Sequence, residues 1–164
     1  MKLIINESGV LERAELEGGL PAIPVGVRNI GEGEFCAPVP LLDIEIPYGV
    51  TGIASDAFAR CDWLAKVTIP DTVTFIGNKA FYDCWPLIEV VLPDSVTRIG
   101  DDAFAECNQL ASITLPRGLQ YIGDRAFAWC ESLTGIEVPH SVAHIGERAF
   151  YGCNCSISFK GVST

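Results

Sequence analysis

The sequence has no long apolar run and no export signal of the usual layout. None of its apolar stretches approaches the ~20 residues of a membrane-spanning helix. The first residues, MKLIINESGVLERAEL, lack the basic segment followed by an apolar segment that marks a signal peptide. The sequence therefore predicts no membrane insertion, and it leaves both a cytoplasmic and an exported location open.

Basic residues are scarce. Lys and Arg number 11 against 21 Asp and Glu, which gives a formal net charge of −10 and an isoelectric point near 4.5. A surface with this charge repels phosphate backbones and anionic lipid headgroups. We therefore expect neither nucleic acid nor an anionic membrane as a partner.

Motifs that carry catalysis are missing as well. The chain has no Gly-rich phosphate loop, because each Ile-Gly pair contributes a single glycine that opens a predicted helix. No Ser/His/Asp or Cys/His group stands apart from the repeated pattern. We expect no catalytic residues, no cofactor and no enzyme activity.

What the chain does contain is a repeat of 23 residues, of which TIPDTVTFIGNKAFYDCWPLIEV (Thr68–Val90) is one copy. A fixed period of this length predicts a solenoid, in which similar coils stack on one another. The period is set by five prolines: Pro47, Pro70, Pro93, Pro116 and Pro139.

Several positions counted from the proline are always apolar, so they are predicted to point into the core. The third residue is Val or Leu, the sixth is Ile, and the seventeenth is Leu in four coils. Phenylalanine recurs at the eleventh position: Phe58, Phe81, Phe104, Phe127 and Phe150. Cysteine recurs at the fourteenth: Cys61, Cys84, Cys107, Cys130 and Cys153.

Local signals predict the elements of each coil. In residues 66–69 apolar side chains alternate with polar ones, which indicates a short strand that Pro70 ends. Gly77-Asn78 and Gly100-Asp101 are typical of a helix start with a capping side chain. The sequence thus predicts an α/β-type solenoid with a short parallel strand and a short helix in each repeat.

The first 20 residues do not fit the repeat. Lys2–Ile5 and Val10–Leu16 flank NESG at residues 6–9, which predicts a β-hairpin. Solenoids need caps because their end faces are apolar. We interpret this hairpin as an amino-terminal cap.

One solenoid domain is expected over residues 1–164. Glu34 and Pro38 replace the Ala and Cys of the repeat, so the helix of the first coil is in doubt. The predicted units are the cap at 1–23, a divergent repeat at 24–46, four full repeats at 47–138, and a last repeat with its tail at 139–164.

These columns (Pro, Val, Ile-Gly, Ala-Phe, Cys and Leu at fixed offsets) resemble the BspA-like leucine-rich repeat family over roughly residues 24–159. The resemblance implies a right-handed leucine-rich repeat coil. It also implies a location on bacterial surfaces, a role in adhesion or protein–protein contact, and no catalytic residues.

The cysteine column permits two interpretations. Stacking would bring neighbouring cysteines within the Cα separation of a disulfide. The alternative, which we favour, is that they are reduced, small buried residues, because a whole column repeats identically. The count of seven, with Cys36 and Cys155 outside the column, does not suit complete pairing.

Metal sites are weak alternatives. His140 and His144 have zinc-ligand spacing and could act with Cys153 and Cys155, but they span a turn rather than one helix face. Carboxylates brought together by stacking, such as Asp71 and Asp94, could hold calcium. We favour solvated side chains in both cases and expect no metal.

Positions that vary beside the constant columns are the candidate binding surface. We predict that a protein partner contacts the middle of the sheet face and its turns, at Glu89, Val91, Asp94, Thr114 and Tyr121. Five residues past the prolines, Phe75, Arg98, Tyr121 and His144 could form an aromatic and cationic stack.

The exposed sheet face limits how tightly one partner can bind. A face of about 30 by 10 Å offers on the order of 300 Å², below the ~800 Å² per partner of a standard interface. The alternative is a structural or self-associating segment of a longer surface protein. In that case the carboxyl-terminal end face, with its unpaired strand edge, would support a weak homodimer.

Overall fold

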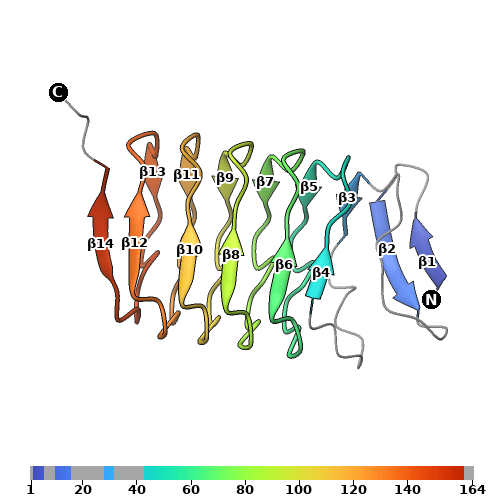
Figure 1. Ribbon diagram of the computed structural model, residues 1–164, viewed down its shortest axis with the longest axis horizontal. Coiled ribbons are helices and arrows are strands. Elements are labelled where there is room, and N and C mark those ends of the chain that lie inside the picture. Colours follow the sequence, from blue (N-terminus) through green and yellow to red (C-terminus); the bar gives the residue numbers. More distant parts are fainter. Residues whose placement is uncertain (1, 6–9, 16–27, 32–42, 161–164) are drawn as a thin grey trace.

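The structure is a computed structural model that describes residues 2–5, 10–15, 28–31 and 43–160, with side chains at 28–31 and 43–160. Successive coils stack side by side along one axis (Figure 1). The strands are β1 (Lys2–Ile5), β2 (Val10–Glu15), β3 (Asn29–Ile30), β4 (Asp43–Glu45), β5 (Gly52–Ile53), β6 (Lys66–Thr68), β7 (Phe75–Ile76), β8 (Glu89–Val91), β9 (Arg98–Ile99), β10 (Ser112–Thr114), β11 (Tyr121–Ile122), β12 (Gly135–Val138), β13 (His144–Ile145) and β14 (Ser156–Phe159).

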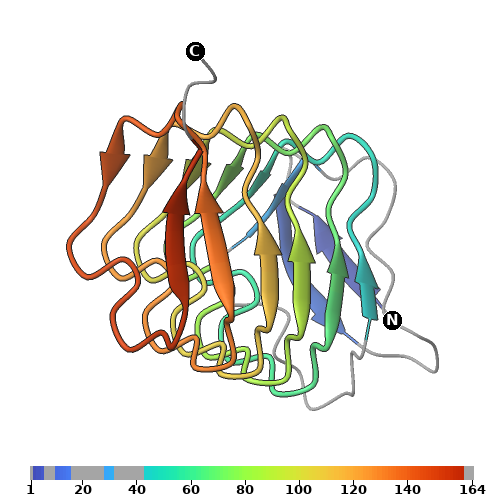
Figure 2. The same ribbon diagram turned by 60° about the vertical axis from the view of Figure 1, so that its left-hand side comes forward.

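Each full coil contributes two strands, one to each of two rows. The long sheet has the order β1-β2-β3-β5-β7-β9-β11-β13, and the second row begins with the four-stranded sheet β4, β6, β8, β10. Beyond β10 the row continues in space with the pair β12 and β14 (Figure 2). All pairings between coils are parallel and in register, for example Val67 with Val90 and Val90 with Ile113. The predicted strand is therefore present, and a second, shorter strand joins it.

The predicted short helix is wrong, because no helix occurs among the described residues. After Gly77 the backbone amides alternate: one donates to a carbonyl of its own coil, and the next donates to a carbonyl of the following coil. The N–H of Tyr82 donates to the carbonyl of Lys79 at 3.0 Å, whereas the N–H of Phe81 donates to Ala103 at 2.8 Å. A helix would use every amide internally. Stacking offers half of them a partner in the neighbouring coil instead, so the segment forms successive turns.

These turns repeat two left-handed backbone positions in nearly every coil. The residues nine and thirteen positions after the proline have positive φ, as at Lys79 (55°) and Asp83 (56°). Such values cost a non-glycine residue roughly 1–2 kcal/mol. The hydrogen bonds made on both sides of each turn offset that cost.

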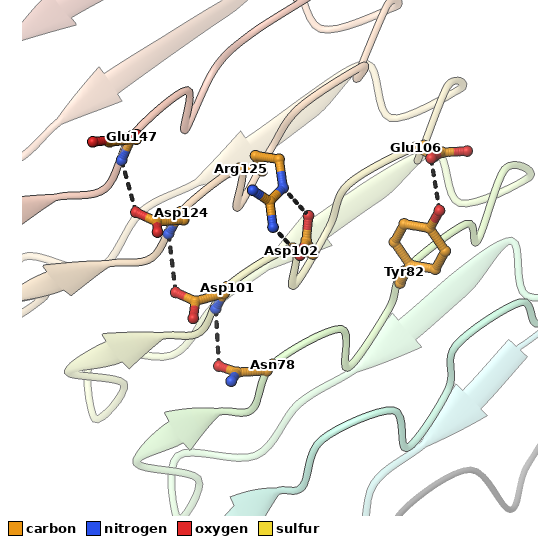
Figure 3. Close-up of polar contacts among 8 residues, drawn as sticks. All are labelled: Asn78, Tyr82, Asp101, Asp102, Glu106, Asp124, Arg125 and Glu147. Atoms are coloured by element: carbon orange, nitrogen blue, oxygen red, sulfur yellow. Dashed lines mark hydrogen bonds and ion pairs between the residues drawn. The ribbon is translucent and has the colours of Figure 1, made fainter.

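The Ile-Gly pair has a different purpose from the one predicted. A Cβ on Gly77 would lie 2.6 Å from the backbone of Ala54, so glycine is required for the coils to approach closely. The side chain after the glycine does not cap its own coil either. Asn78 Oδ1 accepts the N–H of Asp101 at 2.9 Å, and Asp101 Oδ1 accepts that of Asp124 at 3.0 Å (Figure 3).

The predicted apolar columns form the core. Ile53, Ile76, Ile99 and Ile122 are fully buried, as are the Val and Leu columns of the central coils. The phenylalanine rings stack along the axis, with centroids 5.1 Å apart for Phe58 and Phe81 and 5.6 Å for Phe127 and Phe150. The inward assignment of the columns is confirmed for the coils before the last, whereas Ile145 of the last coil is exposed.

The expected amino-terminal hairpin is present, since β1 pairs antiparallel with β2. Strand β2 then pairs parallel with β3, which places the hairpin at the end of the long sheet. The doubtful helix around Glu34 and Pro38, and Cys36, lie outside the described residues. No helix long and apolar enough to cross a bilayer occurs in the part of the chain that the structure describes.

Candidate functional site

The residues of β4, β6, β8 and β10 follow the pattern exposed, buried, exposed along each strand. We call the outward, exposed side chains of these four strands the sheet face. Glu89 and Val91 point outward from β8, and Thr114 points outward from β10. Val91 lies opposite Thr114 in the register, so these side chains are neighbours. Three of the five predicted binding residues thus share one surface.

The other two predicted residues lie elsewhere. Asp94 follows β8 in the turn that leads to the long sheet, where its Oδ1 accepts the N–H of Arg117 at 3.4 Å. Tyr121 belongs to β11 in the long sheet. The structure therefore does not bring Asp94 and Tyr121 together with Glu89, Val91 and Thr114 on one face.

Large apolar side chains are exposed beside the sheet face. Trp63 and Trp85 stand in the turns that precede β6 and β8, and their side chains are 53% and 47% exposed. Ile88 and Val91 follow Trp85 and are 53% and 58% exposed. Large apolar side chains that are exposed to this degree are candidates for an interaction site. We call Trp63, Trp85 and Ile88 the apolar turns.

The sheet face is acidic. In the register, Lys66 lies between Asp43 on one side and Glu89 on the other. The outward residues of β4, β6, β8 and β10 include three carboxylates, at Asp43, Glu45 and Glu89, and one cation, at Lys66. The electrostatic complement of this face is a basic surface.

The predicted stack on the long sheet is present over three side chains. The guanidinium of Arg98 lies 3.8 Å from the ring centroid of Tyr121. The Tyr121 ring stacks on His144 at 4.6 Å with 12° between the ring planes. Phe75 lies opposite Arg98 in the register. This stack ties neighbouring coils together along the long sheet.

The cysteine column is reduced, as predicted. Cys61, Cys84, Cys107 and Cys130 are buried, as predicted. Cys153 departs from the prediction, because it is only partly buried, as is Cys155. Each thiol from Cys84 on donates to the phenylalanine carbonyl of the preceding coil, as from Cys107 Sγ to Phe81 at 3.1 Å. Burial raises the pKa of Cys107 well above its ordinary value. The column is a packing and hydrogen-bonding device.

The structure does not arrange the candidate zinc and calcium ligands as a metal site. His144 stacks on Tyr121, and the Cys153 thiol donates to the carbonyl of Phe127 at 2.9 Å. Within the described ranges, no three His, Cys, Asp or Glu side chains are arranged to hold a metal ion.

Sequence reasoning missed a hollow on the turn side of the coils, which we call the turn-edge groove. It consists of two adjoining hollows of about 320 and 260 Å³ that share Arg60, Lys79 and Tyr82. The larger one continues over Ala105 and Ala128 to Trp129 and includes Asp102, Glu106 and Arg125. A predicted helix would have placed these side chains differently. The signal for the groove was alanine at 105 and 128 where tyrosine stands at 82 and 151.

Four polar side chains of the turn-edge groove are bonded in two pairs. Asp102 holds Arg125 through two hydrogen bonds, of 2.8 Å from Nε and 3.0 Å from Nη2 (Figure 3). The Tyr82 hydroxyl donates to Glu106 Oε1 at 2.7 Å. That bond to a carboxylate raises the pKa of Tyr82 to about 12.

Sequence comparison identifies six copies of the BspA type leucine-rich repeat region in residues 28–156. No curated protein matches the chain.

Solved bacterial structures show the same architecture. A leucine-rich repeat protein of T. pallidum has 32% identity and a TM-score of 0.67 over 79% of this chain and 62% of its own. A leucine-rich cell surface protein of Faecalibacterium prausnitzii has 30% identity and a TM-score of 0.69 over 98% of this chain and 53% of its own. The chain thus spans between half and two thirds of the length of these structures.

Proposed function

Because the chain belongs to the BspA-type leucine-rich repeat family, we propose that it is a non-enzymatic module that binds another protein through its sheet face and apolar turns. The family consists of scaffolds used for protein interaction or structural roles. The observation that supports binding is the exposure of Trp63, Trp85, Ile88 and Val91 in neighbouring coils. Tryptophan is the residue type most enriched at energetic centres of interfaces.

The chemistry of this surface defines the kind of partner. An apolar patch on the partner would cover Trp85, Ile88 and Val91, and basic side chains around it would meet Glu89 and the other carboxylates of the sheet face. The backbone beneath is fixed by in-register pairing of β8 with β6 and β10. A rigid site loses little conformational entropy on binding.

The proposed contact set revises the one expected from the sequence. Glu89, Val91 and Thr114 stay in it, and Trp85 and Ile88 join them. Asp94, in the turn that follows β8, and Tyr121, in the long sheet, lie off the sheet face and leave the contact set.

A bacterial surface location, with a role in adhesion, is part of the proposal. Its support is the Faecalibacterium prausnitzii relative, which is described as a cell surface protein.

Capture experiments test the binding surface. The immobilised chain would be exposed to extracts of surface and secreted proteins beside two variants, Trp85→Ser/Val91→Asp and Tyr121→Ser. We expect a partner that the wild type and the Tyr121 variant retain equally, and that the double variant retains at least about tenfold less. Thermal melts would verify that all three chains fold. Equal retention by the double variant would refute this surface.

The structural alternative rests on the carboxyl-terminal end of the stack. Ile145 of β13 and Ile157 and Phe159 of β14 are exposed there. An exposed strand edge with apolar side chains pairs readily with further coils or with another chain. In this alternative the module lengthens or joins a stack and has no dedicated ligand.

A further inference from the structure

We propose that the turn-edge groove is a second binding site, distinct from the sheet face, and that its ligand is an acidic saccharide. The carboxylate of a hexuronate unit would bind between Arg60 and Lys79, and the sugar rings would lie over the alanine floor toward Trp129. Shape, an aromatic wall, unpaired cations and a saturated backbone support this assignment, each independently of the others.

The shape of the groove comes from a change of side-chain size at one position of the repeat. The twelfth residue after the proline is tyrosine at Tyr82 and Tyr151 but alanine at Ala59, Ala105 and Ala128, and the last two are buried. Two adjacent coils therefore lack the ring that would fill this space. The resulting hollow of about 320 Å³ lies at the lower end of the range of small-molecule sites.

Trp129 forms a fixed aromatic wall. Its indole meets the ring of Tyr151 edge-on at 5.2 Å and lies against Gly152, where a Cβ would be 2.5 Å from the indole. The side chain is nevertheless 45% exposed. A held, half-exposed ring that lines a hollow provides a stacking surface at little entropic cost.

Two cations of the groove are available to a ligand. Arg60 and Lys79 form no ion pair with any described residue, and their charged ends lie 6.0 and 5.9 Å from the Tyr82 ring centroid. The third cation, Arg125, is already held by Asp102. The larger hollow carries three cations against two carboxylates, and the smaller one adds Asp56, so the whole groove is balanced in charge within a chain whose net charge is −10. A carboxylate is the natural counterion for Arg60 and Lys79.

The remaining polar groups suit hydroxyls. Glu106 and Asp102 accept hydrogen bonds, Arg125 donates them, and Asp56 adds an acceptor in the smaller hollow. Side chains that are already oriented by one another present their remaining sites in fixed directions. A sugar ring offers hydroxyls as both donors and acceptors around an otherwise apolar ring.

The backbone argues against an extended peptide. The N–H of Asp102 donates to Asp124, that of Glu106 to Ala128, and the carbonyl of Ala105 accepts from Asp83. Peptides that bind as added strands require free main-chain groups. Here bonds between coils use these groups, so a ligand is recognised by side chains and ring faces alone.

Trp129 offers a direct measurement. The chain has three tryptophans, and Trp63→Phe/Trp85→Phe leaves Trp129 as the sole tryptophan, whose emission is excited at wavelengths that tyrosine does not absorb. We would titrate this chain with tetragalacturonate, with its fully methyl-esterified form, and with a tetraglutamate peptide. We expect a change in Trp129 emission that saturates below about 1 mM tetragalacturonate. The ester and the peptide should bind at least tenfold more weakly.

Matched variants locate the site. Arg60→Gln/Lys79→Gln should raise the dissociation constant at least about tenfold, whereas Lys66→Gln on the sheet face should leave it within twofold. Ala128→Tyr fills the floor with the side chain that the repeat carries at Tyr82 and Tyr151, so it should fold and abolish binding. Unchanged melting temperatures would show that each variant is intact.

Three results would overturn the proposal. They are no saturable response to tetragalacturonate, equal binding of the methyl ester, or equal binding of the tetraglutamate peptide. The second would remove the carboxylate from recognition, and the third would make the groove a site for acidic peptides. Undiminished binding by Ala128→Tyr would place any saccharide site elsewhere.

Discussion

At the scale of single residues, the cysteine column shows why this side chain recurs rather than another small one. Cys84, Cys107 and Cys130 fill space beneath the phenylalanine stack, and each thiol also donates to a phenylalanine carbonyl of the preceding coil. Alanine would leave both a cavity and a less satisfied carbonyl. Valine would fill the space without a donor. A small side chain with a weak donor meets both needs.

Thiol reactivity should follow burial. Under native conditions we expect alkylation at Cys153 and Cys155, which are partly buried, and none at Cys61, Cys84, Cys107 or Cys130 until the chain is unfolded. Burial disfavours the reactive thiolate of Cys107. Mass spectrometry of peptides after timed alkylation measures each site. Modification of Cys107 as fast as of Cys155 would contradict the buried assignment.

Tyr82 should be the last tyrosine to ionise. Its hydrogen bond to Glu106 raises the pKa to about 12, from an ordinary 10.0. Because the folded pKa is raised, this bond stabilises the fold fully below pH 10, and the contribution is lost as the pH rises toward 12. Phenolate absorbance titration should show one late component, which Tyr82→Phe removes and Glu106→Gln shifts to lower pH. Ionisation of all tyrosines together near pH 10 would exclude this bond.

At the scale of the element, the strand was predictable and the turn segment was not. Alternation in Lys66–Thr68 and its copies is a local signal, so outward Glu89, Val91 and Thr114 were assigned correctly. Gly77-Asn78 is equally compatible with a helix cap and with a bond to the next coil. The choice depends on a partner 23 residues away, which local propensity does not contain. The turn-edge groove is built from that same segment, so it was not predicted either.

Substitution by alanine should destabilise the protein at one glycine and have little effect at another. In Gly100→Ala, the new Cβ would lie 2.6 Å from the amide nitrogen of Asn78 in the preceding coil. We expect a loss of about 1–3 kcal/mol in the free energy of unfolding. In Gly118→Ala, the nearest atom is 3.4 Å away, so the change should stay within about 0.5 kcal/mol. Denaturant melts compare the two. Similar losses would mean that the coils do not approach as closely as described.

At the scale of the whole molecule, the two ends of the stack differ. The hairpin of β1 and β2 lies at one end of the long sheet, whereas β13 ends that sheet at the other. In the other row, β14 pairs with β12 and exposes all four of its residues. The repeat count and the order of coils were readable from the period of the sequence. The state of the end face depends on what a neighbouring molecule or segment covers.

The chain alone should associate weakly through its carboxyl-terminal end. Pairing two such faces would remove Ile145, Ile157 and Phe159 from water, but the area is small against the cost of association. Sedimentation equilibrium should show a dimer only at high concentration, and Phe159→Glu should abolish it. Tyr48→Glu, at another exposed aromatic, is the control. Monomers at all concentrations, or equal effects of both variants, would rule out this contact.

The hydrogen bonds between adjacent coils have a mechanical consequence. Among the described residues, side-chain hydrogen bonds between coils join positions 22 to 26 apart, so these bonds hold each coil to its immediate neighbours. A pulling force applied to the two ends would therefore meet one interface at a time. The exposed last coil should peel away first, and each released coil should lengthen the tether by roughly 75 Å, the span of 23 extended residues. Under load such a molecule unfolds one coil at a time, and each step absorbs mechanical work while the remaining coils stay folded.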